Sequence, residues 1–180
     1  PLMLLNAVVT RDGRKMIIGT QPMSFLMRPA VNTTGPLPVG PDAIDFGTFF
    51  ANQDPGNLRL LTALRMNATF PYITPMVTLP SEPPMRVMDA GARDNYGYRS
   101  TLAFLFTFRK WIKANTGGVV ILQLRDAQKE LDVHPTDGSL IGRMTNPIGT
   151  VYDNVVRVQD QDYDLMVQQA SGWTDFPLEV

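Results

Sequence analysis

The 180-residue sequence contains no cysteine, which excludes a disulfide framework and any zinc site built on thiolates. The absence of cysteine also agrees with a reducing compartment. Sixteen basic and 17 acidic side chains leave a net charge of -1, so the basic surface that typically binds nucleic acid is lacking. No stretch approaches the roughly 18 consecutive apolar residues that span a bilayer. We therefore expect no nucleic-acid partner, and a cytoplasmic or membrane-peripheral location is favoured.

The first residues also lack the features of a signal peptide. The segment PLMLLNAVV has no basic start and no small-residue cleavage site. The continuous apolar run at 2–9 instead predicts a strand covered on both faces, as in the middle of an α/β sheet. A chain of this length with 44% hydrophobic residues can bury one sizeable core. Because it opens on Pro1 and enters a buried strand at once, we interpret residues 1–180 as a single-domain fragment of a larger protein.

Turn signals organise the first part of the chain. Asp12 and Gly13 separate the run at 2–9 from the apolar segment 15–19, and Asp-Gly between two such segments indicates a β-hairpin. Five prolines between residues 22 and 48 predict a long surface excursion with little regular structure.

Two helices are expected between the hairpin and residue 116. Asp54 as N-cap and Pro55 as first helical residue predict the start of one. Its apolar positions would be Leu58, Leu61 and Leu64. The most strongly patterned helix spans 96–115 and is stopped by the glycines at 117–118. Its apolar face comprises Phe104, Leu105, Phe108, Trp111 and Ile112.

Further strands are expected around these helices. A proline-rich irregular connection at 71–84 precedes a short strand, MRVM, at 85–88. The apolar segment 119–124 predicts a second buried strand, and a loop at 135–138 precedes a helix at 149–170. Apolar strands separated by helices favour an α/β fold, a layered sheet with flanking helices, over an all-β sandwich.

The short strand runs into the segment RVMDAGARDNYGYRS at 86–100, which places a carboxylate, Asp89, before a glycine turn. By spacing alone, Asp-x-Gly is an abundant turn. Three segments together, however, resemble the patatin-like phospholipases. They are LMLLNAVVTRDGRKMIIG, ALRMNATFPYITPMV and VMDAGARDNYG, the last being similar to that family's Asp-Gly-Gly or Asp-Gly-Ala signature followed by Asp-Asn.

The resemblance covers residues 1–116 and implies the C-terminal portion of a patatin-like fold, with 117–180 adding a strand and a helical region. It implies a serine acyl hydrolase with a Ser-Asp catalytic pair, no cofactor, and a lipid or other acyl ester as substrate. Carried over by motif, Asp89 is the general base, Gly91 lets the chain turn closely beneath it, and Asn95 belongs to the supporting loop. Ala90 departs from the usual first glycine of the signature.

The nucleophile of such an enzyme is missing from this sequence. No serine has glycines two residues before and after it, which excludes the Gly-x-Ser-x-Gly elbow, and no glycine-rich oxyanion loop is present. The serines are Ser24, Ser81, Ser100, Ser139 and Ser171. The resemblance therefore implies that the nucleophile lies upstream or on another chain, that the missing N-terminal segment is a partner, and that this chain alone is inactive. His134, the single histidine, is interpreted as a solvated loop residue that a Ser-Asp pair does not need.

Several alternatives remain open. A non-catalytic ligand-binding or scaffold domain would contain the same aspartate as a turn residue. The segment VMDAG also resembles the aspartic-protease loop, although Ala90 replaces its hydroxyl residue and a second copy is absent. The helix at 96–115 could lie on a membrane surface through its aromatic residues, but we favour packing against the sheet.

Two other residue sets have plainer interpretations. Alternate acids could suggest a calcium loop, but the required glycine and closing glutamate are absent, so a solvated helix face is favoured. These acids are Asp160, Asp162 and Asp164. Methionines could line a lipid-adaptable groove, although a core role is the plainer interpretation. They include Met23, Met27, Met85 and Met88.

Overall fold

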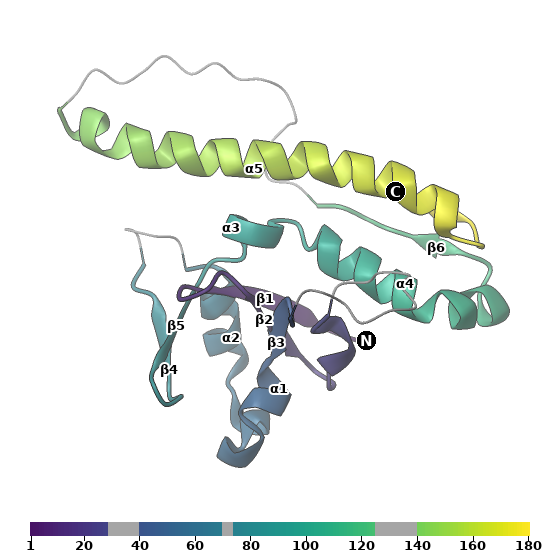
Figure 1. The fold of residues 1–180 in the computed structure, drawn as a ribbon, viewed down its shortest axis with the longest axis horizontal. Helices are drawn as coiled ribbons and strands as arrows, with labels where there is room; N and C mark the ends of the chain where they lie inside the picture. The colour runs from purple at the N-terminus through teal and green to yellow at the C-terminus, as the bar shows by residue number, and fades with distance from the viewer. Residues whose placement is uncertain (29–39, 70–73, 125–139) are drawn as a thin grey trace. The chain divides into compact units, whose positions relative to one another are not determined.

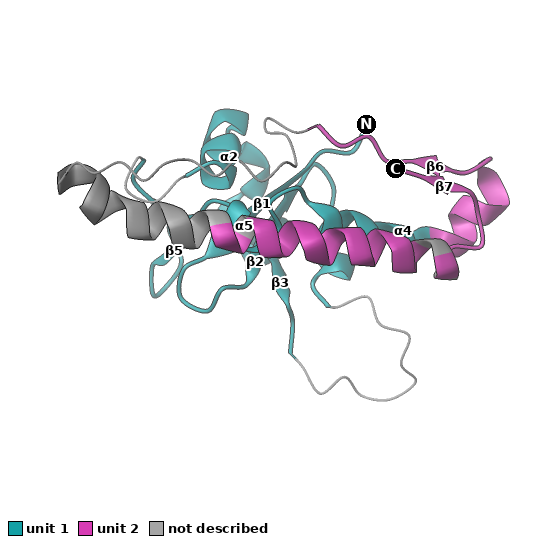
Figure 2. Ribbon diagram, turned by 90° about the horizontal axis from the view of Figure 1, so that it is seen from above, with its two compact units in different colours: residues 1–108 teal, residues 109–180 magenta. Residues whose placement is uncertain are grey.

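The structure, a computed structural model, describes residues 1–28, 40–69, 74–124 and 140–180 (Figure 1). The chain divides into two compact units, residues 1–108 and residues 109–180 (Figure 2). The boundary falls within the helix α4 (Tyr98–Asn115). The two units are considered in turn.

Unit 1 is built on a five-stranded mixed sheet with the order β3-β2-β1-β5-β4. The strands are β1 (Leu4–Val9), β2 (Lys15–Gly19), β3 (Ala43–Asp45), β4 (Val77–Leu79) and β5 (Met85–Met88). β1 lies at the centre (Figure 1) and pairs antiparallel with both β2 and β5, whereas β2 and β3 are parallel. The predicted central strand and the general α/β class are therefore confirmed.

The β1–β2 hairpin forms where Asp-Gly predicted it. The Val9 amide donates to the Arg14 carbonyl at 2.9 Å, and the Gly13 amide donates to the Val9 carbonyl at 2.9 Å. Gly13 has φ +71°, a conformation that glycine adopts without a Cβ clash. The turn sets the register that pairs Val8 with Lys15.

The main hydrophobic core lies between the sheet and the helix α2 (Leu60–Asn67). Its buried residues are Ala7, Val9, Met16, Ile18, Ile44, Phe46, Phe50, Ala63, Met66, Leu79 and Val87. From α2 the core receives Ala63 and Met66, whereas Leu61 is 78% exposed. The predicted apolar face is therefore wrong for Leu61 and Leu64, which are exposed. Of the three predicted leucines, only Leu58 packs against the core.

The start of α2 explains this difference. Asp54 takes a left-handed conformation with φ 50°, and Pro55–Asn57 forms only a 3-10 turn, η3. The helix then begins at Leu60, with Arg59 as its N-cap residue. Leu58 is outside the helix, so the three leucines do not share one helical face.

Short elements occur where the sequence predicted irregular chain. Residues 22–48 contain η1 (Ser24–Leu26), β3 and α1 (Phe46–Phe49), and another 3-10 turn, η2 (Ala51–Gln53), follows. The buried Asp45 carboxylate accepts hydrogen bonds from the Gly47 amide at 3.3 Å, the Thr48 hydroxyl at 2.6 Å and the Met23 amide at 3.3 Å. One aspartate thus caps α1 and fastens η1 to β3, an arrangement that requires tertiary contacts.

The stretch 71–84 likewise contains the strand β4, which the sequence did not predict. β4 pairs antiparallel with β5, bringing Val77 opposite Val87 and Leu79 opposite Met85. Met85 packs against the main core, and Met23 is buried in a second cluster with Ile17, Leu26 and Ala43. These contacts agree with the core interpretation for Met23 and Met85, whereas Met27 and Met88 are half-buried.

The long predicted helix is present as α4, preceded by the short helix α3 (Gly91–Asp94). Leu102, Leu105 and Ile112 are buried. Phe25 contacts Phe104 and Phe108, with ring centroids 6.2 Å and 5.2 Å apart. The predicted apolar face is wrong for Trp111, which is 60% exposed. None of the helices in the described ranges contains an apolar stretch sufficient to span a bilayer.

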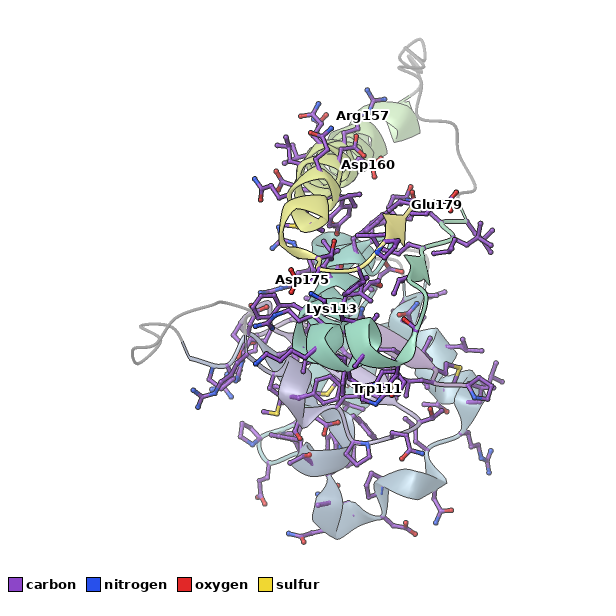
Figure 3. The ribbon with its side chains drawn as sticks, turned by 90° about the vertical axis from the view of Figure 1, so that its right-hand side faces the viewer. Trp111, Lys113, Arg157, Asp160, Asp175 and Glu179 are labelled. Carbon is purple, nitrogen blue, oxygen red and sulfur yellow. The ribbon has the colours of Figure 1, made fainter. Side chains whose placement is uncertain are left out.

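Unit 2 contains the helix α5 (Leu140–Trp173) and a two-stranded parallel sheet of β6 (Val119–Val120) and β7 (Leu178–Glu179). The predicted helix at 149–170 therefore exists and is longer, and the loop predicted at 135–138 lies outside the described residues. Lys113 of α4 forms an exposed ion pair with Asp175 at 3.6 Å (Figure 3). The predicted burial of 119–124 is wrong, because Val120, Leu122 and Leu124 are 71%, 81% and 83% exposed.

Two alanine substitutions in α2 test this assignment of its faces. We expect Met66→Ala to lower the free energy of unfolding by about 2–5 kcal/mol, because a fully buried side chain would leave a cavity. Leu61→Ala should change it by no more than about 0.5 kcal/mol. Urea denaturation of both variants measures the difference, and a larger loss for Leu61→Ala would show that the sequence pattern had identified the buried face.

Candidate functional site

Asp89 lies directly after β5, as predicted, in the loop that leads to α3. Its side chain is half-buried, and Oδ1 accepts a hydrogen bond from the Gly91 amide at 2.5 Å. The Asp89 amide donates to the Thr69 carbonyl at 3.1 Å, and the Ala90 amide donates to the Asn67 carbonyl at 3.4 Å. The loop is therefore fastened to the end of α2, and the carboxylate is oriented by its own turn.

The alanine at position 90 fits this loop. Ala90 has φ -65° and ψ -25°, a right-handed conformation that any L-residue adopts. A glycine is therefore not needed at this position, and the departure from the Asp-Gly-Gly pattern adds no backbone strain. Gly91 is buried and begins α3.

Arg93 fastens the same loop to two other parts of unit 1. Its Nη1 donates to the Gly13 carbonyl in the hairpin turn, and its Nη2 donates to the Asp42 carboxylate just before β3. The Asp42 amide in turn donates to the Met27 carbonyl at 2.7 Å. A planar guanidinium can hold two acceptors in fixed directions, so Arg93 sets the position of α3 relative to the sheet.

Asp94, which is 1% exposed, organises the start of α4. Its Oδ1 accepts from the Arg99 amide at 3.1 Å, and its Oδ2 accepts from the Ser100 amide at 3.2 Å and the Ser100 hydroxyl at 2.9 Å. Backbone amides at a helix start need such acceptors. Gly97, with φ +71°, provides the turn between α3 and α4.

A buried polar cluster surrounds this carboxylate. Lys15 Nζ donates to Ser100 Oγ at 3.3 Å and lies 4.0 Å from Asp94 Oδ2, and Asn6 Nδ2 donates to Ser100 Oγ at 3.2 Å. We call Asn6, Lys15, Asp94 and Ser100 the buried polar cluster. Burial lowers the pKa of Lys15 from its ordinary value, and the nearby Asp94 charge opposes that shift. The cluster joins β1, β2 and the start of α4.

This cluster was not predicted from the sequence. The family resemblance implied Asn95 as the supporting residue, and the structure places Asn95, half-buried, in the turn between α3 and α4. The adjacent Asp94 makes the capping contacts described above. Its signal was an aspartate a few residues before a strongly patterned helix, which is typical of helix starts.

Ser100 has neighbours of the types that activate a serine nucleophile, a carboxylate and a lysine. It is nevertheless 1% exposed, and its Oγ is in hydrogen bonds with three side chains of the cluster. A substrate carbonyl cannot reach this oxygen in the structure. The cluster therefore supports the fold at this position.

Of the other serines, only Ser24 and Ser81 have side chains that the structure describes, and neither hydroxyl is paired with a base. Ser24 is exposed in η1, and the Ser81 hydroxyl donates to the Pro83 carbonyl at 2.9 Å. Ser171 belongs to α5. Ser139 and His134 lie outside the described residues.

The alternative metal site finds no support in the ranges that the structure describes. Asp160, Asp162 and Asp164 belong to the helix α5 and not to a loop. No group of three or more acidic, histidine or cysteine side chains is placed to hold a metal ion among those residues.

Comparison of the chain with protein-family models, with curated proteins and with solved structures found no match. The interpretation of the Asp89 loop therefore rests on its own residues and geometry.

The lowered pKa of Lys15 predicts a pH dependence of stability. In the unfolded chain this lysine titrates near 10.5. Between the lowered pKa and that value the unfolded state binds more protons, so the free energy of unfolding rises with pH. We therefore expect the unfolding free energy of wild type to rise relative to that of Lys15→Met as the pH rises towards about 10.5.

Urea denaturation of both proteins between about pH 8 and 11 measures this difference. Groups whose titration is the same in both proteins cancel in the comparison. A difference that stays constant or falls with pH would show that Lys15 is not disfavoured in its charged form by the fold.

Proposed function

We propose that this chain supplies the general base, Asp89, of a patatin-like lipid acyl-ester hydrolase. The observation that carries the proposal is the position of Asp89 directly after β5, with its carboxylate oriented by the Gly91 amide at 2.5 Å. This placement accords with the resemblance of VMDAGARDNYG to the signature of that family. A carboxylate at a strand end, on a turn held from two sides, is well suited to face a substrate.

The surroundings of Asp89 support this role through rigidity. A general base works only when it is held within hydrogen-bond reach, roughly 2.6–3.2 Å, of the proton that it removes. The loop is held by α2 through Thr69 and Asn67, by the hairpin and Asp42 through Arg93, and by the buried polar cluster through Asp94. These contacts restrict the motion of the turn that carries Asp89.

The proposed reaction has two steps. A serine hydroxyl attacks the ester carbonyl carbon while Asp89 accepts the serine proton, and that proton then passes to the departing alcohol as the ester bond breaks. In the second step Asp89 accepts a proton from water, the hydroxide attacks the acyl-serine, and the proton returns to the serine oxygen as the acid is released. The substrate is a lipid or another acyl ester, and no cofactor takes part.

In this scheme the serine and the oxyanion donors would come from a segment outside the 180 residues of this sequence. A membrane surface is a natural location for such a substrate. The alternative function, a non-catalytic ligand-binding or scaffold domain, would leave Asp89 as a turn residue only.

The isolated chain should be inactive. Incubated with a short-chain activated ester, it should show no turnover above that of Asp89→Ala, because the sequence has neither a Gly-x-Ser-x-Gly elbow nor a glycine-rich oxyanion loop. A fluorophosphonate probe should label neither the wild-type chain nor a matched Ser100→Ala variant. Labelling that disappears in Ser100→Ala would locate the nucleophile in the buried polar cluster and overturn the assignment of Asp89.

The decisive test places this chain together with a Gly-x-Ser-x-Gly segment in one longer protein. Asp89→Asn should keep the fold, because the amide is nearly isosteric and its oxygen can still accept from the Gly91 amide. Ester turnover should fall by about 10²–10⁴-fold, because asparagine cannot take the serine proton. Asp175→Asn, which alters only an exposed ion pair, is the matched control and should keep full activity.

Turnover and melting temperature are measured on the same preparations. A purely structural aspartate would behave in the opposite way, with a loss of on the order of 1 kcal/mol in stability and unchanged turnover per folded molecule. That outcome would favour the scaffold alternative.

A further inference from the structure

The outer face of α2 exposes three leucines that lie close together on the helix. Leu60, Leu61 and Leu64 are 53%, 78% and 43% exposed, whereas Ala63 and Met66 are buried in the main core. Successive residues of an α-helix are about 100° apart, so the three leucines share an arc of about 100° that points away from the core. We call them the leucine face. Exposed large apolar side chains grouped in this way are typical of an interaction site.

The charged residues beside the leucine face are basic. Arg59, the N-cap residue of α2, directly precedes Leu60, and Arg65 directly follows Leu64. Both arginines are exposed, and the segment 55–69 contains no acidic residue. An apolar centre with basic flanks is complementary to a lipid surface, which offers hydrocarbon beneath and negative headgroups above.

We propose that α2 docks on an anionic lipid surface, with the leucine face at the level of the acyl chains and the two arginines at the headgroup phosphates. The charges favour this occupant over a second copy of the chain. Two α2 helices packed through their leucine faces would bring arginines towards arginines, and like charges at an interface are unfavourable. Anionic headgroups instead attract both guanidinium groups.

The same helix fastens the loop that carries Asp89. The Asn67 and Thr69 carbonyls, at and just after the end of α2, accept hydrogen bonds from the amides of Ala90 and Asp89. Docking of α2 would therefore bring this loop to the surface in which a lipid ester lies. That consequence rests on the proposed function, whereas the docking itself does not.

The binding should be weak and should need both parts of the surface. Three partly inserted leucines bury little hydrocarbon, and even a complete myristoyl chain gives only marginal, reversible attachment to a bilayer. Two arginines near an anionic surface add a comparable electrostatic attraction. Loss of either the leucine face or its basic flanks should therefore be measurable.

Cosedimentation of the 180-residue chain with vesicles tests the apolar part. Wild type should bind vesicles of phosphatidylcholine and phosphatidylserine, and Leu61→Gln should lower the partition coefficient about tenfold, because a leucine no longer enters the hydrocarbon. Leu165→Gln, at a position of α5 that is 57% exposed, is the matched control and should bind as wild type does. Both variants should keep the wild-type melting temperature, since both leucines are exposed. Equal binding of wild type and Leu61→Gln would overturn the proposal.

The basic part is tested on the same vesicles and on vesicles of phosphatidylcholine alone. Arg59→Gln and Arg65→Gln should each weaken binding to the anionic vesicles about fivefold and leave binding to the neutral ones unchanged. Arg65 makes one exposed hydrogen bond, to the Pro75 carbonyl at 3.4 Å, so melting temperatures are compared as well. A wild-type chain that binds neither kind of vesicle would overturn the proposal and leave the leucine face to a protein partner. Vesicle binding needs no nucleophile, so this failure is distinct from a failure of the proposed hydrolysis.

Discussion

The contact between Lys15 and Asp94 joins two buried charged groups from separate elements of unit 1, β2 and α3. Two charged side chains that are almost completely buried would be costly alone, because each loses its hydration. The charges lie 4.0 Å apart, and Ser100 Oγ hydrogen-bonds to both. Removing either partner would leave the other charge buried without compensation, whereas replacing the whole pair by apolar side chains could cost little. The cluster therefore acts mainly on conformational specificity, because it is satisfied only when β2 and the start of α4 meet in one arrangement.

The position of Asp89 follows from that constraint and from two others. Asp94 ends α3 and lies five residues after Asp89, so fixing Asp94 limits where the turn at 89–91 can be. Arg93 adds contacts with the hairpin and Asp42, and α2 holds the backbone of Asp89 from the opposite end of the loop. A loop held in this way would need little reorganisation, which is the property that the proposed general base would require. The same contacts would also serve a structural turn, which is why activity and stability must be measured together.

Local signals were sufficient for some elements and insufficient for others. The Asp-Gly hairpin, the strand at 85–88 and the helix from 98 to 115 could be predicted because turn chemistry or periodicity within the segment determines them. The strands β3 and β4 could not, since three residues form a strand only when a neighbour provides the pairing. The buried polar cluster joins Asn6 and Lys15 to Asp94 and Ser100, residues that are distant in sequence, and no local pattern links them. In α2, a left-handed Asp54 moved the helix start and thereby changed which side chains face the core.

The two most apolar runs of the chain illustrate the same limit. The sequence predicts strands covered on two faces at both 2–9 and 119–124. In the structure, the first run lies at the centre of a five-stranded sheet, whereas the second pairs only with the two residues of β7. Val8 and Val9 are buried in the first, whereas Val120 and Leu122 are exposed in the second. A strand's own residues determine how much apolar surface needs covering, but its neighbours determine whether that surface is covered. The mismatch between apolar character and exposure at 119–124 is thus a property of its surroundings.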